Sequence, residues 1–252
     1  MFTLPNLILG AVAALIVGLS KTAFPGAALV ATPIIATIVG GRAIAGTTLP
    51  LLLAGDVFAV IWYGHHTRWD LLKPMIVAVC VGFAAGAVFF AVVGSSTRPM
   101  EIVIGLCILV IAMMQAWRMS RRLEPVPPTA TTAAVYGCSG GFTTFVASAA
   151  GPILNTYLIR LGLGKDELVG TSAWFYFAVN STKLPIYIAL GFWTSGGSFF
   201  TPSTLSFDAV MFPAVLIGLL SGRRLLHVLS EKVFLIAVLI LSTAGAIKLL
   251  LP

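Results

Sequence analysis

Charged residues are scarce in this chain. Of its 252 residues only 9% are charged, whereas 59% are hydrophobic. A soluble domain of this length carries about a quarter charged residues. Because so few charges cannot cover a surface that faces water, we expect lipid to cover most of it. The shortage excludes an ordinary soluble fold and predicts an all-α polytopic membrane protein whose first partner is the lipid bilayer.

Several motifs that carry chemistry are also missing. Cys80, Cys107 and Cys138 stand alone in apolar runs, without CxxC or Cys/His spacing, so we predict small buried side chains and no metal site. The sequence has no Gly-x-x-x-x-Gly-Lys-Ser/Thr motif, which excludes ATP hydrolysis through a P-loop. Neither HExxH nor a Ser-His-Asp set is recognisable. No cofactor is predicted.

The net charge of +7 does not indicate nucleic-acid binding. The basic residues stand singly or in short clusters between apolar runs, where they read as topology signals that face anionic lipid headgroups. Hydrophobic stretches fill the rest of the chain, at about 5–39, 43–64, 72–94, 99–117, 131–163, 167–192, 207–226 and 231–250. The hydrophilic segment 118–129 separates a repeat at 1–117 from a second repeat at 130–252.

The two halves resemble each other. Five residues of the first half recur in order in the second, and they are Gly40, Gly46, Thr47, Ala54 and Tyr63, matched by Gly164, Gly170, Thr171, Ala178 and Tyr187. In the same register Asp56 is matched by Asn180, and farther on Gly82 and Gly86 are matched by Gly218 and Gly222. Chance similarity between apolar segments is the alternative. Internal repeats are typical of transporters, with the substrate site at the repeat interface.

Two stretches are too long for one crossing. A straight helix over 7–39 would be about 50 Å long, against a hydrocarbon core of about 30 Å. Helix-breaking residues lie near the middle of this stretch, at 18–26, and of the stretch 131–163, at 148–152. We call them the first break and the second break. Each stretch forms either a re-entrant hairpin or one broken, tilted span.

The distribution of basic residues favours re-entrant hairpins. If all eight stretches cross the membrane, the two sides carry nearly equal numbers of basic residues. If the first and fifth stretches turn back, only Arg42, Arg98 and Lys248 lie on one side, which fits the positive-inside rule. Each half then has three transmembrane helices, so the halves form an inverted repeat. This arrangement predicts a bacterial cytoplasmic (inner) membrane protein with both termini on the non-cytoplasmic side.

Two lysines lie inside hydrophobic stretches, and both are candidates for binding an anion. A lysine at the membrane centre costs about 2.5–3.5 kcal/mol unless it faces a wet cavity or a partner. Lys21 lies in the first break. Lys183 lies on a polar helical face that is formed by Ser172, Tyr176, Asn180, Lys183 and Tyr187. Snorkelling lysines and a polar seam between packed helices are the alternatives.

The breaks add a second anion-binding element. Helices that begin near Pro25-Gly26 and Gly151-Pro152 would point their N-termini, with free N–H groups and a positive dipole end, at the membrane middle. Ser20, Thr22, Ser148 and Asn155 could donate hydrogen bonds. Asp56, the one acid deep inside a predicted span, could pair with a lysine or carry a coupling proton or cation. Asp208 lies near a segment end, where we expect an interfacial role.

On these residues the chain resembles the TauE/SafE family of sulfite and organosulfonate exporters over nearly its whole length. The resemblance rests on the two breaks, on Gly46-Thr47-Thr48 and Gly170-Thr171-Ser172, and on the string Asn180-Ser-Thr-Lys183-Leu-Pro185. The breaks lack the family's Gly-x-Gly-Gly pattern, so the chain looks like a divergent sub-branch. The resemblance implies export of sulfite, sulfoacetate or a related anion, driven by an ion gradient. The predicted substrate-binding residues are Ser20, Lys21, Thr22, Pro25, Gly26, Ser148, Gly151, Pro152, Asn155, Thr171, Tyr176, Asn180 and Lys183.

Three functional hypotheses follow. A secondary transporter would bind a small anion at the membrane midplane and rock one half against the other. A passive anion channel would use the same lysines. A membrane-embedded enzyme would use Ser20 as nucleophile and Lys21 as base, although adjacent helical residues do not face each other. The sequence leaves a homo-oligomer open.

Overall fold

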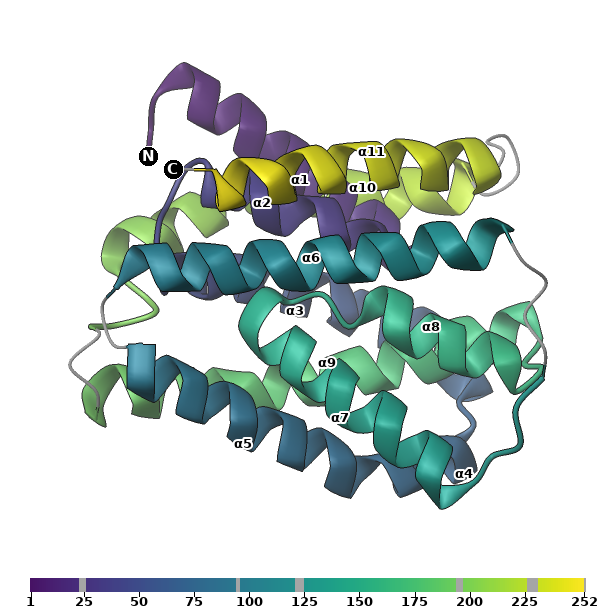
Figure 1. Ribbon diagram of the computed structural model, residues 1–252. Helices are drawn as coiled ribbons and strands as arrows, with labels where there is room; N and C mark the ends of the chain where they lie inside the picture. The colour runs from purple at the N-terminus through teal and green to yellow at the C-terminus, as the bar shows by residue number, and fades with distance from the viewer. Residues whose placement is uncertain (23–25, 94–95, 121–124, 194–196, 226–230, 252) are drawn as a thin grey trace.

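The described part of the structure is helical throughout. The computed structural model describes residues 1–22, 26–93, 96–120, 125–193, 197–225 and 231–251, and no strand occurs among them (Figure 1). The first half forms α1 (Leu4–Thr22), η1 (Ala27–Val30), α2 (Ala31–Ala36), α3 (Ala43–Tyr63), η2 (Gly64–His66), α4 (Trp69–Leu72), η3 (Lys73–Met75), α5 (Ile76–Val93) and α6 (Thr97–Ser120). The second half forms α7 (Ala130–Ala147), α8 (Gly151–Arg160), α9 (Lys165–Trp193), α10 (Pro202–Leu225) and α11 (Glu231–Leu250). The all-α prediction is confirmed.

Within the described residues, five helical segments are long and apolar enough to cross a membrane, and they are Leu4–Thr22, Ala43–His66, Trp69–Val93, Thr97–Ser120 and Pro202–Gly222. Large apolar side chains point outward from them, such as Val77 and Val92, which are 74% and 80% exposed. Such a surface suits lipid. The 29-residue α9 is not among the five, because its charged first turn and polar face lower its hydropathy. The chain is therefore a multi-pass membrane protein.

Both overlong stretches are broken, as predicted. Helix α7 ends at Ala147, where Ser148 adopts a left-handed conformation with φ of 53°, and α8 begins at Gly151 with Pro152 in its first turn. The Val126 amide, which precedes α7, donates to the carbonyl of Arg160 at the end of α8 (2.9 Å). The two helices therefore form a hairpin that returns to the end where it began.

The first break has a similar course. Helix α1 ends at Thr22, and η1 begins at Ala27 after Gly26, whose φ is 100°. Pro25 lies outside the described residues. The start of α1 contacts the start of α10, because the hydroxyl of Ser203 donates to the sulfur of Met1 (3.4 Å). The segment after α2 returns to the same end, where Arg42 contacts the Gly197 carbonyl.

The helix bundle has two distinct ends. One end holds both termini, which lie close together in Figure 1, and there the Arg98 guanidinium donates to the last carbonyls of α11. At the other end Arg68 pairs with Glu167 (3.4 Å), next to the start of α9. Arg160 and Lys165 lie at this second end, as the re-entrant arrangement predicts. Which end faces the cytoplasm stays a prediction.

The helices of each half pack mainly against helices of the other half. The most extensive helix pairs are α1 with α10, α5 with α7, α6 with α11, and α3 with α9, and each pair joins the two halves. A Cβ at Gly18 would lie 2.2 Å from the Val215 oxygen, and one at Gly141 would lie 2.6 Å from the Val79 oxygen. Val79 and Val215 correspond in the proposed repeat, in the register that matches Gly82 with Gly218. The contacts are thus reciprocal, although the inverted repeat itself stays a prediction.

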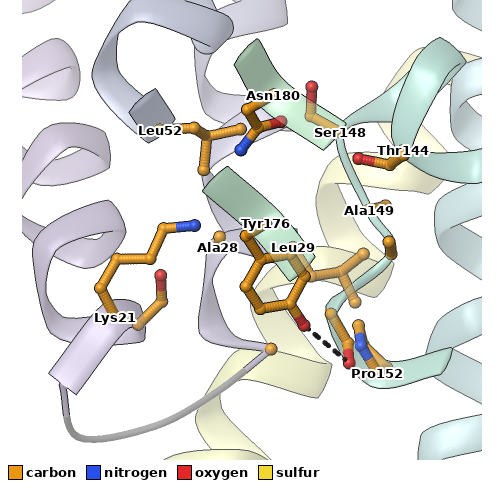
Figure 2. A pocket seen from close by; sticks show the side chains of 14 residues that line it. Lys21, Ala28, Leu29, Leu52, Thr144, Ser148, Ala149, Pro152, Tyr176 and Asn180 are labelled. Carbon is orange, nitrogen blue, oxygen red and sulfur yellow. Dashed lines mark hydrogen bonds between the residues drawn. The ribbon is translucent and has the colours of Figure 1, made fainter. Parts of the chain in front are cut away.

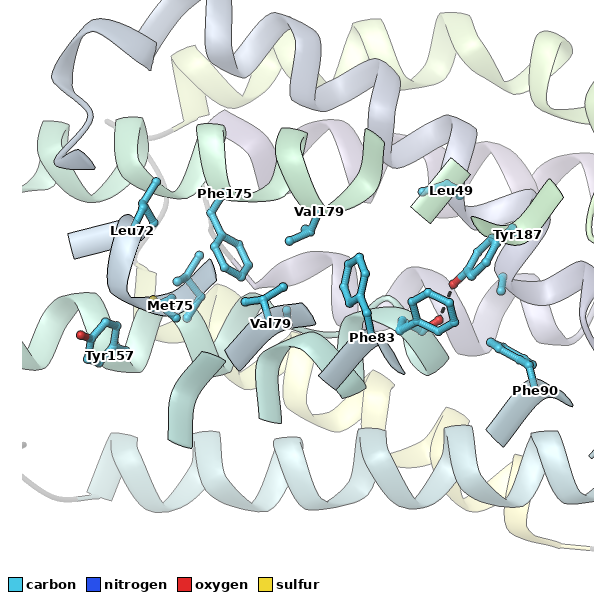
Figure 3. Close-up of a cluster of buried hydrophobic side chains, with 14 of the residues drawn as sticks. Leu49, Leu72, Met75, Val79, Phe83, Phe90, Tyr157, Phe175, Val179 and Tyr187 are labelled. Atoms are coloured by element: carbon cyan, nitrogen blue, oxygen red, sulfur yellow. Dashed lines mark hydrogen bonds between the residues drawn. The ribbon is translucent and has the colours of Figure 1, made fainter. Parts of the chain in front are cut away.

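Two helix groups surround the centre of the molecule. One apolar cluster joins α1, α2, α3 and α10, and a second joins α5, α7, α8 and α9 through side chains such as Phe83, Phe145 and Tyr187 (Figure 3). We call these groups the α1 bundle and the α7 bundle. In each bundle the broken stretch comes from one half of the sequence, and one long helix, α10 or α5, comes from the other half. The predicted domain division at 118–129 stays a prediction, but the two repeats do not pack as separate bodies.

Candidate anion-binding site

The two breaks meet at the centre of the molecule. A Cβ added to Gly151 would lie 2.8 Å from the Cα of Gly26, so the two chain segments touch there. Beside this contact lies a cavity of about 30 Å³ (Figure 2). One water needs about 10–15 Å³, so the cavity has room for very few waters or one compact ion. Its lining residues are Ser20, Lys21, Gly26, Ala28, Leu29, Leu52, Thr144, Ser148, Ala149, Ala150, Gly151, Pro152, Tyr176 and Asn180.

Lys21 comes from the last turn of α1 and is 9% exposed, so it does not snorkel to the surface. Its side chain crosses α3 at Gly55, where a Cβ would lie 2.9 Å from the Lys21 Cγ. The Lys21 Nζ lies 2.6 Å from the Asp56 Oδ1 and 4.7 Å from the centre of the Tyr176 ring. The glycine before Asp56 therefore lets a long cation reach a buried carboxylate.

Asp56 is completely buried and lies behind the cavity lining. Its second oxygen, Oδ2, accepts a hydrogen bond of 2.5 Å from the side-chain amide of Asn180. Asp56 and Asn180 are equivalent positions of the proposed repeat, and so are the regions around Gly26 and Gly151. Equivalent residues of the two halves thus meet at the site, the arrangement of a transporter whose substrate binds between repeats.

Lys183 is completely buried but does not line the cavity. Its Nζ donates to the carbonyl of Thr144 (3.0 Å) and lies 3.3 Å from the Thr144 hydroxyl, which does line the cavity. Lys21, Lys183 and Asp56 together carry a formal charge of +1. Burying an unbalanced charge is costly, so an anion in the cavity would complete the charge balance.

The second break supplies donors. Ser148 lines the cavity, and its buried hydroxyl has no hydrogen-bond partner among the described residues. Helix α8 begins at Gly151, and the first amides of a helix have no carbonyl partner within it. Helix α8 is ten residues long, and the positive end of its dipole favours an anion at this place. The Tyr176 hydroxyl donates to the Gly151 carbonyl (3.3 Å) and fixes α9 against the break.

Four predicted site residues lie elsewhere. The Thr22 hydroxyl donates to the Leu219 carbonyl (3.2 Å) and joins α1 to α10. The Thr171 hydroxyl accepts from the Arg68 amide (3.0 Å), and the Asn155 side chain accepts from Ser172 (3.2 Å). These three contacts position helices, as does Lys183. The structure thus brings Ser20, Lys21, Gly26, Ser148, Gly151, Pro152, Tyr176 and Asn180 together around the cavity.

Sequence reasoning missed three buried polar residues. Thr144 lines the cavity, but nothing in its local sequence distinguishes it from other threonines. Arg42, expected in a loop, is 4% exposed and donates to the Phe90 carbonyl (2.5 Å). Asp208, expected at an interface, is 6% exposed in α10, which begins at Pro202, and neither of its carboxyl oxygens has a hydrogen-bond partner among the described residues. The start of α10 at Pro202, before the predicted stretch, is the feature that would have indicated the burial of Asp208.

The geometry agrees with a comparison of the chain with known protein families. A model of the family described as sulfite exporter TauE/SafE matches residues 10–249, nearly the whole chain. No curated protein and no solved structure matches the chain. The match covers both breaks, all the cavity-lining residues and the long helices of both halves. The chain therefore belongs to the TauE/SafE family of sulfite exporters.

Proposed function

We propose that this protein is a secondary transporter of a small sulfur oxyanion, and that the cavity between the two breaks is its substrate site. The observation that carries the proposal is Lys21, a buried cation that lines the cavity beside the contact between Gly26 and Gly151. A compact oxyanion there would accept hydrogen bonds from the lysine, from Ser148 and from the first amides of α8.

Size and charge favour sulfite over larger organosulfonates such as sulfoacetate. The cavity measures about 30 Å³, and small residues (Ala149, Ala150 and Gly151) form one of its walls. Lys21, Lys183 and Asp56 leave a net positive formal charge whether or not Asp56 carries a proton, which favours an anion. A longer substrate would have to displace the chain at one of the breaks.

The burial of the polar cavity residues supports alternating access. Ser20, Thr144 and Ser148 are each 9% exposed or less, so these three residues have little contact with solvent outside the protein. Helix α5 of the first half belongs to the α7 bundle, and α10 of the second half belongs to the α1 bundle. The moving bodies would therefore be these two bundles rather than the two sequence halves. A passive anion channel, the alternative, needs an open path instead.

The enzyme hypothesis loses support from the geometry. The Ser20 hydroxyl donates to the Val17 carbonyl (2.7 Å), and the Lys21 Nζ is engaged by Asp56. A base must lie within hydrogen-bonding reach of the nucleophile it activates. The two adjacent residues are directed to different partners.

Counterflow in proteoliposomes tests the proposal. With the membrane potential held at zero by an ionophore, vesicles loaded with unlabelled sulfite should transiently concentrate radiolabelled sulfite, which a channel cannot do under these conditions. The variant Lys21→Met should lose this uptake. Uptake without a transient maximum would indicate a channel, and no uptake of any sulfur anion by the wild type would contradict the proposal.

A double variant separates binding from stability. Lys21→Met leaves Asp56 buried without its cation, which costs about 3–5 kcal/mol. Adding Asp56→Asn removes the orphaned charge, so the double variant should regain much of the lost stability and still not transport sulfite. Normal transport by the double variant would show that Lys21 only balances Asp56.

A further inference from the structure

Asp56 forms a buried cluster with Lys21 and Asn180. Anion binding alone does not require the carboxylate in this cluster. One carboxylate oxygen of Asp56 lies 2.6 Å from the Lys21 Nζ, and the other accepts a hydrogen bond of 2.5 Å from the side-chain amide of Asn180. Lys21 and Asn180 line the cavity, whereas Asp56 does not. Lys21 and Asn180, the two side chains best suited to hold an anion, therefore each direct one N–H group at a carboxylate behind the cavity wall.

We propose that Asp56 is the proton-binding residue of the transport cycle, and that one proton binds to it together with each anion, because the anion and Asp56 compete for Lys21 and Asn180. This inference rests on the proposed function of the cavity. An anion that draws the Lys21 ammonium toward it leaves Asp56 as a fully buried carboxylate without its cation, which is costly. A proton on Asp56 removes that charge and leaves Lys21 free for the anion.

The groups around Asp56 limit what else could take the proton. Lys21 from α1 and Lys183 from α9 are the charged groups that act on it, and Tyr176 from α9 faces Lys21. Helix α2, which also packs against α3, carries no ionisable residue. Helix α10 carries Asp208, which has no hydrogen-bond partner. Within the described residues, Asp56 is thus the one acid that shares donors with the cavity.

Linkage gives the proposal a measurable size. If one proton is taken up for each anion bound, the affinity for the anion must rise about tenfold for each unit by which pH falls. The anion must also raise the proton affinity of Asp56 by the same factor by which protonation of Asp56 raises the affinity for the anion. A site in which Lys21 and Asp56 keep their ion pair throughout predicts no proton uptake beyond that of the ligand.

Isothermal titration calorimetry of the purified full-length protein with sulfite tests this. Titrations in two buffers of different ionisation enthalpy give the number of protons taken up, and the titration of sulfite itself is subtracted. We expect an excess uptake approaching one proton per anion in the wild type. Sulfite binding with no excess uptake would overturn this inference alone. No sulfite binding would overturn the proposed function as well.

Two variants assign the proton. Asp56→Asn should abolish the excess uptake and bind sulfite at least as tightly as the wild type does. Asp208→Asn, which removes a second buried acid outside the site, should leave the uptake unchanged. Loss of uptake in Asp208→Asn but not in Asp56→Asn would overturn the assignment. If Asp56→Asn does not fold, the proton count of the wild type and of Asp208→Asn still decides.

Discussion

Ser148 combines backbone strain with an unused hydroxyl. It is the non-glycine residue with a positive φ (53°) among the described residues, and its hydroxyl has no partner although it is 9% exposed. The left-handed conformation costs about 1–2 kcal/mol for a residue with a Cβ. Because a glycine would suit this position better, we propose that the serine is present for its hydroxyl.

The variant Ser148→Gly separates these two contributions. It relieves the strain, so the protein should unfold at the same temperature as the wild type or a higher one, yet sulfite should bind more weakly because a donor is lost. Ser20→Ala is the matched control, since that hydroxyl already donates to Val17, and it should change the affinity less. Calorimetry and thermal unfolding measure both effects. Unchanged affinity in Ser148→Gly would remove this hydroxyl from the site.

Lys183 acts through Thr144 rather than by touching the cavity. Its Nζ donates to the Thr144 carbonyl near the end of α7, which also accepts from the Ser148 amide (3.0 Å), and a cation is favourable at this end of a helix. A hydrogen bond from a charged donor contributes about 1.5–3 kcal/mol.

Lys183→Met should therefore lower the unfolding temperature and weaken sulfite binding less than Lys21→Met in the Asp56→Asn background does. Thermal unfolding and calorimetry on the same samples test this order. A stable Lys183→Met protein with no sulfite binding would instead place the ammonium on the anion.

Glycines on α7 set how closely the helices pack. Gly141 faces α5, where a Cβ would lie 2.6 Å from the backbone oxygen of Val79, whereas a Cβ at the neighbouring Gly140 would meet the nearest atom, the Ile153 Cγ2, at 3.8 Å. Close backbone approach through small residues is how membrane helices associate.

These two glycines give a matched pair of variants. Gly141→Ala should destabilise the protein by about 1–3 kcal/mol, as overpacking does, because the α5 backbone cannot yield as a side chain can. Gly140→Ala should leave stability unchanged or raise it, since alanine favours helix by about 1 kcal/mol. Unfolding in mixed micelles measures both. Equal effects of the two variants would show that the α5–α7 contact is loose.

The helices themselves were largely predictable, because apolar length and helix breakers are local properties. The predicted stretch at 43–64 matches α3 closely, and the break at 148–152 falls between α7 and α8. The start of α10 was missed by several residues because polar residues at 202–206 precede the apolar run. Asp208 therefore lies farther inside its helix than the sequence predicted, and the protein buries its side chain.

The site was only partly predictable, because it depends on which helices meet. Polar residues inside apolar segments identified Lys21, Asn180 and Asp56, and the repeat matched Asp56 with Asn180. The partner of Lys183 was not predictable, since it depends on the position of the α7 backbone. Thr171 and Asn155 carry the same local signals as the cavity residues but hold helix ends together.

For the whole molecule, the two ends of the bundle predict its orientation in the membrane. Both termini lie at the end that carries Arg42 and Arg98, and the opposite end carries most of the other basic residues. The positive-inside rule assigns that opposite end to the cytoplasm. Alkaline phosphatase fused to the C-terminus should therefore be active in bacteria, and green fluorescent protein in the 118–129 linker should fluoresce. The reverse pattern would invert the topology.

The central claim is that one compact anion binds between the two breaks. Selenite, a heavier analogue of sulfite, can be located by anomalous diffraction from crystals of the protein. The account predicts an anomalous peak in the cavity, within about 4 Å of the Lys21 Nζ, beside Ser148 and the start of α8. Peaks confined to basic residues on the surface at saturating selenite, with the cavity empty, would contradict it.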